Sequence, residues 1–413
     1  GIYYGWIVVA VTFLTLLVAA GVRGAPGIII IPIEGEFGWD RASISLAIAV
    51  NLVAYGLASP LSGRLINRFG TRAVTIWALV LSIVGTLGVL IMRSLVELNL
   101  WWGIVVGVGT GAIAMTLAAT VATRWFGARR GLVTGILGAG SSAGQLVFVP
   151  AMMALTGAFG WRAAIALGAA ALVLLCLPLV AVFLRNDPAE LGLQPLGSDQ
   201  PAAGATAPAE AVSIGRALRT GDFWLLAGSF SLCGFTTIGV INTHFIPHAL
   251  EHGFTTEIAA GALAVIGAMN VVGTMASGYL TDKFNPRLLL AIYYGLRAAS
   301  LVALPFIGDP VGLTIFAVFF GLDYIATVPP TVALAADRFG RAAIPVVFGW
   351  IFCAHQLGAA VSSYLAGLMR VWLGDYQVAF IGAGLLGFIA VALSLGISSA
   401  SKEPAPGAAE GAA

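Results

Sequence analysis

Stretches of roughly 20 apolar residues recur along the chain and alternate with short polar turns such as NRFGTR and GARRG. Roughly 20 apolar residues are what a helix needs to cross the hydrocarbon core of a bilayer, and lipid admits only helices and closed barrels. The apolar stretches lie at 6–31, 42–63, 73–92, 98–123, 131–157, 163–184, 222–247, 257–280, 288–308, 311–336, 342–369 and 377–398. They predict an all-α membrane protein with twelve transmembrane helices.

The composition supports lipid as the solvent for this chain. Of its 413 residues, 59% are hydrophobic and only 9% are charged, and the mean hydropathy is +0.99. Soluble domains carry about 25% charged residues. The net charge of +2 includes no dense basic run, which excludes nucleic-acid binding. There is no Walker motif for ATP, and the three cysteines lie in apolar stretches without metal spacing, so we expect neither a cofactor nor a metal.

One segment interrupts the apolar pattern. Residues 186–212 are rich in Pro, Ala and Gly and contain no stretch that could span a membrane, which is typical of a linker. We therefore predict a six-helix bundle at 1–185, a cytoplasmic linker at 186–220 and a second six-helix bundle at 221–400. The remaining residues, 401–413, are predicted to be a disordered tail.

The distribution of Lys and Arg predicts the orientation. Cytoplasmic loops of membrane proteins are enriched in these residues. Thirteen of them lie in the even-numbered loops and the linker, against four in the odd-numbered loops. We therefore expect both termini and the linker in the cytoplasm of a multi-pass protein of the cell membrane.

The two halves of the chain resemble each other. GRLINRFGTR at 63–72 matches GYLTDKFNPR at 278–287, and TRWFGARRG at 123–131 is echoed by DRFGRAA at 337–343. Two six-helix halves in the same orientation are the parallel repeat of the major facilitator architecture. GRLINRFGTR resembles the loop signature of that superfamily, with Asn67 in place of the usual aspartate and Asp282 retaining it in the second half.

Four further motifs resemble the monocarboxylate transporter family and its bacterial relatives. They are YGWIVV at 4–9, IEGEFGW at 33–39, RWFGARRGLVTGI at 124–136 and FGWRAA at 159–164. The resemblance implies a secondary transporter of a small organic anion, a monocarboxylate, working by proton symport with alternating access. It also implies that spans 1, 4, 7 and 10 line a central cavity.

Arg23 is the first candidate for binding the substrate. A charged side chain at membrane depth is costly and indicates function by default, and a guanidinium binds a carboxylate through two parallel hydrogen bonds. The resemblance implies a lysine near this position, which aligns with Gly24. The alternative is that Arg23 reaches the outer headgroups or pairs with Glu34 or Glu36.

Three other ionisable side chains lie well inside predicted spans. Asp323 could take up and release a proton, or it could be a structural partner of an arginine or of backbone groups near the following prolines. His355 is a second candidate for proton coupling and for substrate binding, because histidine titrates near neutral pH. Arg297 lies on an outer helix and is expected to pack or to snorkel to the membrane surface rather than to bind substrate.

Uncharged polar side chains complete the predicted substrate site. The resemblance implies an aspartate and an arginine in span 8 where this chain has Asn270 and Thr274, which could still hydrogen-bond a substrate or could serve helix packing. The repeat places Asn242 opposite Arg23. The other predicted substrate-binding residues are Thr116 and Tyr55.

A separate group of polar residues lies in the loops after spans 2 and 8. We expect these side chains to pair with the cytoplasmic ends of neighbouring helices and to act as gates. They are Arg64, Arg68, Arg72, Asp282, Lys283 and Arg287.

Rival functions remain open. The runners-up are an exporter of amphiphilic compounds and an organic-anion exchanger, and a third interpretation is a sensor that binds a solute without moving it. An enzyme is not expected, because the polar groups form no nucleophile–base arrangement and no metal triad. The expected partners are the organic anion, protons and the lipid bilayer, and we expect a monomer.

Overall fold

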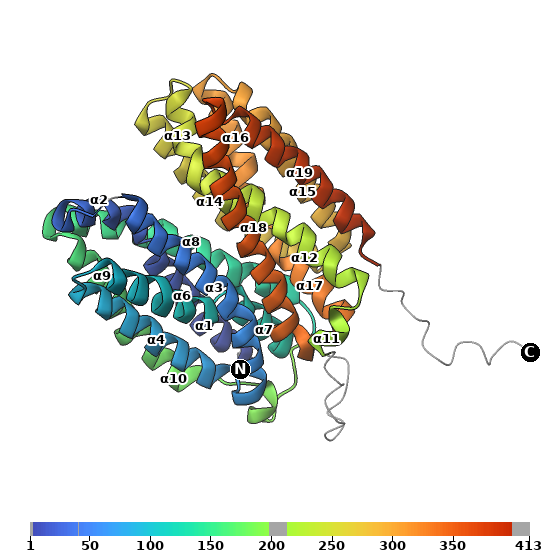
Figure 1. The fold of residues 1–413 in the computed structure, drawn as a ribbon. Helices are drawn as coiled ribbons and strands as arrows, with labels where there is room; N and C mark the ends of the chain where they lie inside the picture. Colours follow the sequence, from blue (N-terminus) through green and yellow to red (C-terminus); the bar gives the residue numbers. More distant parts are fainter. Residues whose placement is uncertain (1–2, 40, 198–212, 399–413) are drawn as a thin grey trace, which may run out of the picture.

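The computed structural model describes residues 3–39, 41–197 and 213–398, and these fold almost entirely into helices (Figure 1). Twelve helical segments are long and apolar enough to cross a membrane, as predicted. Among the described residues, the one β-type pairing is an isolated bridge between Phe126 and Leu196. The predicted tail at 401–413 and positions 198–212 of the predicted linker lie outside the described residues.

The helices divide between the two halves of the chain. The first half contains α1 (Gly5–Arg23), α2 (Pro26–Phe37), α3 (Arg41–Phe69), α4 (Thr71–Ile91), α5 (Leu95–Leu98), α6 (Gly107–Ala112), α7 (Met115–Trp125), α8 (Arg130–Phe159), α9 (Trp161–Ala171) and α10 (Leu177–Phe183). After α11 (Ile214–Ala217), the second half contains α12 (Gly221–Gly234), α13 (Thr243–Glu251), α14 (Thr256–Thr281), α15 (Pro286–Ala303), α16 (Pro310–Asp323), α17 (Val328–Phe339), α18 (Ile344–Leu373) and α19 (Gln377–Gly396). π-Helical turns continue three of the spans, at Asn99–Val106, Leu172–Cys176 and Phe235–Asn242.

The halves are joined mainly by α3 packing on α18 and α8 packing on α14, with smaller contacts of α7 with α18 and of α8 with α17. Glycines allow the backbones to approach closely, as is usual where membrane helices pack. A Cβ atom added to Gly63 would lie 1.8 Å from the carbonyl oxygen of Pro345, and one added to Gly131 would lie 2.5 Å from that of Gly278. These positions therefore exclude any side chain while the halves are in this arrangement.

The halves meet at one end of the molecule and separate at the other. We call the end where α10 finishes and α12 begins the linker face, and the opposite end the distal face. At the linker face, Arg130 pairs with Asp337 of the other half at 3.2 Å, and the Arg341 guanidinium donates to the carbonyl of Phe126. At the distal face, α2 and α13 lie apart (Figure 1). The contact between halves thus closes the linker face.

Three of the predicted spans are not continuous helices. Span 1 breaks between α1 and α2, span 4 between α6 and α7, and span 10 between α16 and α17. Pro26, Pro329 and Pro330 lack the N–H group that a continuous helix needs, and the glycine-rich GVGTGA of α6 is a weak helix former. The breaks leave backbone groups without helical partners at the places where side chains of interest lie.

Candidate functional site: Arg23 and its surroundings

Arg23 is the last residue of α1, at the break before α2, and its side chain is half-buried. Its guanidinium carbon lies 4.2 Å from the centre of the Tyr55 ring, which is a cation–π distance. None of the ion pairs among the described residues includes Arg23. Glu36, one of the expected partners, is bound instead to Arg162. Arg23 is therefore held against an aromatic ring, and no carboxylate among the described residues neutralises its charge.

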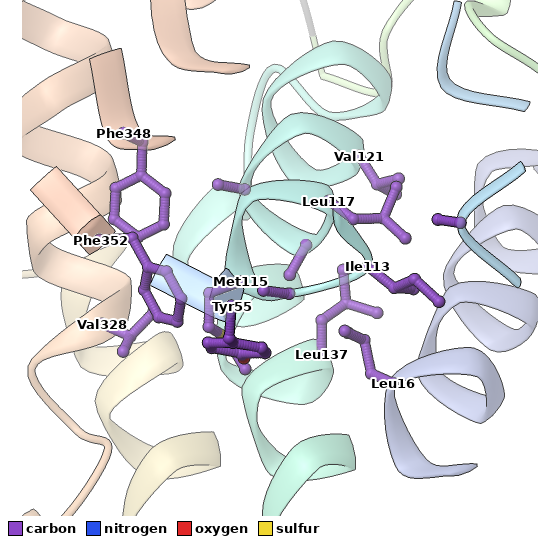
Figure 2. Close-up of a cluster of buried hydrophobic side chains, with 14 of the residues drawn as sticks. Leu16, Tyr55, Ile113, Met115, Leu117, Val121, Leu137, Val328, Phe348 and Phe352 are labelled. Atoms are coloured by element: carbon purple, nitrogen blue, oxygen red, sulfur yellow. The ribbon is translucent and has the colours of Figure 1, made fainter. Parts of the chain in front are cut away.

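Aromatic side chains from both halves surround this position. The ring of Tyr55 on α3 lies 5.7 Å from that of Phe352 on α18, and Figure 2 shows Phe352 and Phe348 approaching Tyr55 from the second half. The His355 ring is parallel to Phe352 at 5.9 Å and lies 4.6 Å from Phe230. His355 is buried, and its Nδ1 has no hydrogen-bond partner among the described residues. Tyr55 and Phe352 thus connect Arg23 to an imidazole whose Nδ1 has no hydrogen-bond partner among the described residues.

Asn242 and Tyr324 extend the surroundings of Arg23 along the second half. Asn242 ends the π-helical turn of span 7 and is exposed, and Tyr324 begins the break in span 10. Asn242 and Arg23 both lie within interaction range of Tyr324. That Asn242 lies opposite Arg23 and binds the substrate stays a prediction.

The other intramembrane arginine is neutralised inside the second half. Nε of Arg297 donates to Oδ2 of Asp323 at 2.6 Å, and both side chains are almost fully buried. Nη2 of Arg297 donates to the carbonyls of Asp323 and Tyr324, at 2.7 and 3.3 Å, and Nη1 lies 2.9 Å from Sγ of Cys233. Arg297 therefore holds the break in span 10 together. Of the two alternatives expected for Arg297, packing inside the protein is the one observed, because Asp323 and the freed carbonyls give it partners there.

Asn270 and Thr274 use their hydrogen-bonding groups within the protein. Nδ2 of Asn270 donates to the Ser142 hydroxyl of the other half at 2.8 Å. Its Oδ1 accepts from the Thr274 hydroxyl at 3.0 Å and from the backbone amide of Ile325, in the span 10 break, at 3.2 Å. Asn270 thus ties α8, α14 and span 10 together, an arrangement that favours helix packing over substrate binding.

Thr116 is also engaged by its neighbours. It is fully buried at the start of α7, and its hydroxyl shares a hydrogen bond with that of Ser59 on α3. Of the seven predicted substrate-binding residues, Arg23, Tyr55 and His355 are connected through the rings of Tyr55 and Phe352, whereas Asn270, Thr274 and Thr116 are bonded within the helix packing. Their roles in binding stay predictions.

Some of the predicted gating residues form hydrogen bonds within the protein, and the others are exposed at the surface. Asp282 accepts hydrogen bonds from the amides of Gly131 and Leu132, at 2.7 and 2.8 Å, and so caps the first turn of α8 across the contact between halves. Arg72 donates to the carbonyl of Ala181, and Arg287 donates to that of Ile397 at 2.9 Å, each within its own half.

The remaining predicted gating residues project outwards. Arg64, Arg68 and Lys283 are exposed. The guanidinium of Arg68 lies 5.1 Å from the centre of the Phe69 ring, and Nζ of Lys283 lies 4.3 Å from that of Tyr279. Whether any residue of these two loops gates transport stays a prediction.

Several contacts were not foreseen from the sequence. The cross-half pair of Arg130 and Asp337, and the bond from Arg341 to Phe126, join the repeated motifs at 123–131 and 337–343, whose similarity did not predict that they contact each other. By contrast, pairing with an arginine was one of the alternatives predicted for Asp323, and the structure identifies that arginine as Arg297.

Glu36 offers a test of the distal face by pH. Hydrogen bonds from Arg162 and Trp161, both at 2.7 Å, lower the pKa of the Glu36 carboxyl. A lowered pKa contributes stability above the ordinary pKa of the group, and that stability is lost as the pH falls through the lowered value. Because the pair is exposed, Glu36→Gln is expected to cost less than about 1 kcal/mol at neutral pH, and the cost is expected to shrink as the pH falls below the ordinary carboxyl pKa of 4.5. The melting temperatures of the unsubstituted protein and of Glu36→Gln, measured between pH 7 and pH 3, check this. A difference in melting temperature that does not change with pH would contradict it.

The twelve helices long and apolar enough to cross a membrane, in two packed halves, indicate a multi-pass membrane protein. The family model of the Major Facilitator Superfamily matches residues 11–363, so the chain belongs to this superfamily. It is a transporter of small molecules embedded in the membrane, and not an enzyme.

Curated relatives and solved structures agree with this assignment. The chain is 27% identical to monocarboxylate transporter 11 of Mus musculus, covering 92% of this chain and 84% of the relative. It is 24% identical to the uncharacterized MFS-type transporter YcxA of Bacillus subtilis, covering 88% of both. Among solved structures, the proton:xylose symporter XylE superimposes with a TM-score of 0.73 at 19% identity, over 94% of each chain. The fucose:proton symporter FucP of E. coli gives 0.68 at 17%, over 94% of this chain and 98% of that one.

Proposed function

We propose that this chain carries a small monocarboxylate across the cell membrane together with protons, by alternating access. One observation carries the proposal: of the two arginines inside the spans, Arg297 is neutralised by Asp323, whereas Arg23 has no acidic partner among the described residues. A single uncompensated cation within apolar and aromatic walls suits an anion with a short apolar body. The similarity to monocarboxylate transporters is consistent with this substrate class.

The orientation and the conformational state belong to the same proposal. Lys and Arg are concentrated in the loops of the linker face, so we place that face in the cytoplasm. With the linker face closed, the half-buried Arg23 would be reached from outside the cell. Rocking of the halves would then open the linker face and close the distal face.

Coupling to protons would involve His355 rather than Asp323. Asp323 is fixed as the counter-charge of Arg297, and giving it a proton would leave that arginine buried without a partner. His355 lies near Arg23 with a free Nδ1. A carboxylate bound at Arg23 would offset the positive charge there and favour the protonated imidazole, so anion and proton would bind together.

An acid pulse on proteoliposomes tests the proposal. Lactate, pyruvate, glycolate and acetate are added outside proteoliposomes that hold a trapped pH dye. The signal from each acid is compared with that from vesicles that contain the dye but no protein. We expect acidification above the passive leak for at least one acid. Arg23→Ala is expected to weaken the apparent affinity about 10- to 100-fold, because a charge-assisted hydrogen bond contributes about 1.5–3 kcal/mol. Arg23→Lys, which keeps the positive charge, should retain part of the apparent affinity. Unchanged transport by Arg23→Ala would contradict the proposal.

Anion exchange is the second candidate, and the ion pair of Arg297 with Asp323 favours it. That pair removes one of the two predicted proton carriers and leaves His355 alone. An exchanger would give no acidification in empty-lumen vesicles and rapid uptake of labelled anion once an internal anion is supplied. His355→Gln distinguishes the two: it should abolish acidification in a symporter and leave exchange unaffected.

A further inference from the structure

A lateral cavity of about 310 Å³ lies between α3, α4 and α6, away from the contact between halves. Its walls are mainly large apolar side chains, namely Leu61, Leu65, Phe69, Trp77, Leu81 and Val108. The hydroxyl of Ser62, which also lines it, already donates to the carbonyl of Ala112 at 3.0 Å. The cavity therefore offers little to a polar solute and suits a hydrocarbon chain.

The cavity opens towards the lipid, and its length matches one leaflet. Trp77, Phe69 and Leu61 are 72%, 55% and 51% exposed, and in a membrane this surface faces the acyl chains. The lining residues of α3 extend from Ala58 to Phe69, a rise of about 16 Å along the helix. This is close to half of the roughly 30 Å hydrocarbon core. An acyl chain of the leaflet at the linker face would fill the cavity from the headgroup level to the middle of the membrane.

Positive charge lies at the linker-face end of the same helix. Arg64 and Arg68 are exposed near the end of α3, and the ion pairs of the described residues include neither. The guanidinium of Arg68 lies over the ring of Phe69, which lines the cavity. Arg72, by contrast, is bound to the carbonyl of Ala181. Two guanidinium groups without an acidic partner among the described residues thus lie on the linker-face half of the stretch of α3 that lines the cavity, within reach of an anionic headgroup.

We propose that this cavity is a binding site for one anionic phospholipid of the linker-face leaflet. Its acyl chain lies between α3 and α4, and its phosphate is bound by Arg64 and Arg68. Because α3 also contacts α18 through Gly63, the lipid touches a helix that has to move during transport.

Native mass spectrometry of the full-length protein tests the site. The delipidated protein is mixed with equal amounts of phosphatidylglycerol and phosphatidylcholine. We expect one tightly bound phosphatidylglycerol, favoured roughly 5- to 30-fold as expected for two arginines near an anionic surface. R64Q/R68Q should lose the preference. Lys283→Gln, the equivalent position of Arg68 in the second half, is the matched control and should keep it. Ala73→Phe, which fills the cavity wall, should lose the bound lipid with both arginines intact.

Three outcomes would overturn the proposal. A preference that R64Q/R68Q retains would show that the arginines do not bind the headgroup. A preference that Ala73→Phe leaves intact would mean that anionic lipid is attracted only to the surface, with no chain in the cavity. A dimer that Ala73→Phe converts to monomer would identify a second copy of the chain as the occupant. The arginine variants alter exposed side chains, so their fold should survive and the first outcome remains decisive even if Ala73→Phe misfolds.

Discussion

Arg297→Met is expected to destabilise the protein by about 3–5 kcal/mol, because it leaves the Asp323 carboxylate buried without a counter-charge. The same substitution removes the donors for the carbonyls of Asp323 and Tyr324 at the span 10 break. The break would then have to rearrange or admit water. The fraction of monodisperse protein that remains after heating in detergent measures the effect, since membrane proteins seldom unfold reversibly.

A second substitution separates the charge from the backbone contacts. The double variant R297M/D323L removes both charges and should recover part of the loss, since an apolar replacement of a buried pair is often neutral. It should not recover all of it, because the freed carbonyls still lack donors. The control is Arg370→Met, which breaks the exposed pair with Glu251 in the same half and should cost less than about 1 kcal/mol. Equal losses of stability in Arg297→Met and Arg370→Met would contradict the conclusion that Arg297 holds the span 10 break together.

The same double variant decides the role of Asp323 in transport. If the ion pair only positions the break and Tyr324, R297M/D323L should still couple the anion to protons, at a reduced rate. If Asp323 carries the proton, the variant should move the anion without acidification. Measuring labelled anion and trapped-dye signal on the same vesicles distinguishes these cases.

The sequence predicts the membrane layout well because lipid imposes strict rules on it. Span length, the positive loops and the internal repeat require no knowledge of side-chain geometry, and all twelve spans are present. The repeat also extends to detail: Arg72 and Arg287, which are 215 residues apart, each bond the carbonyl at the end of the sixth span of their half. The proposed bundle boundaries and the cytoplasmic placement of the termini stay predictions.

The site is harder to predict because hydropathy does not fix how a helix is rotated about its axis. In the sequence, Asn270 and Tyr55 are each an uncharged polar residue within an apolar span, and nothing distinguishes their roles. The structure ties Asn270 to Ser142 and to the Ile325 amide, whereas the Tyr55 ring lies under Arg23. The surroundings of the helix breaks are hard to predict for the same reason. Pro26 predicts a break near Arg23, but the partners of the backbone groups that the break frees depend on tertiary packing.

Gly63→Ala is expected to abolish transport while leaving the protein folded. The new Cβ would lie 1.8 Å from the carbonyl oxygen of Pro345, and neither backbone can avoid the contact by changing a rotamer. The substitution therefore penalises the arrangement in which α3 and α18 touch at the linker face. It should not penalise an arrangement in which that face is open. A penalty of a few kcal/mol on the arrangement with a closed linker face is enough to change which arrangement predominates, since about 5.5 kcal/mol moves a two-state equilibrium from 1:99 to 99:1.

Distances between spin labels report which face is open. Labels at Arg68 and Lys283, equivalent exposed positions of the two halves, should move apart in Gly63→Ala, and labels at Gly35 and Leu250 on the distal face should approach each other. Gly261→Ala in α14 is the matched control, because a Cβ there meets nothing within 4 Å. It should leave transport and both distances unchanged. Unaltered distances in Gly63→Ala, with transport intact, would show that the α3–α18 contact tolerates the methyl group and does not hold the linker face closed.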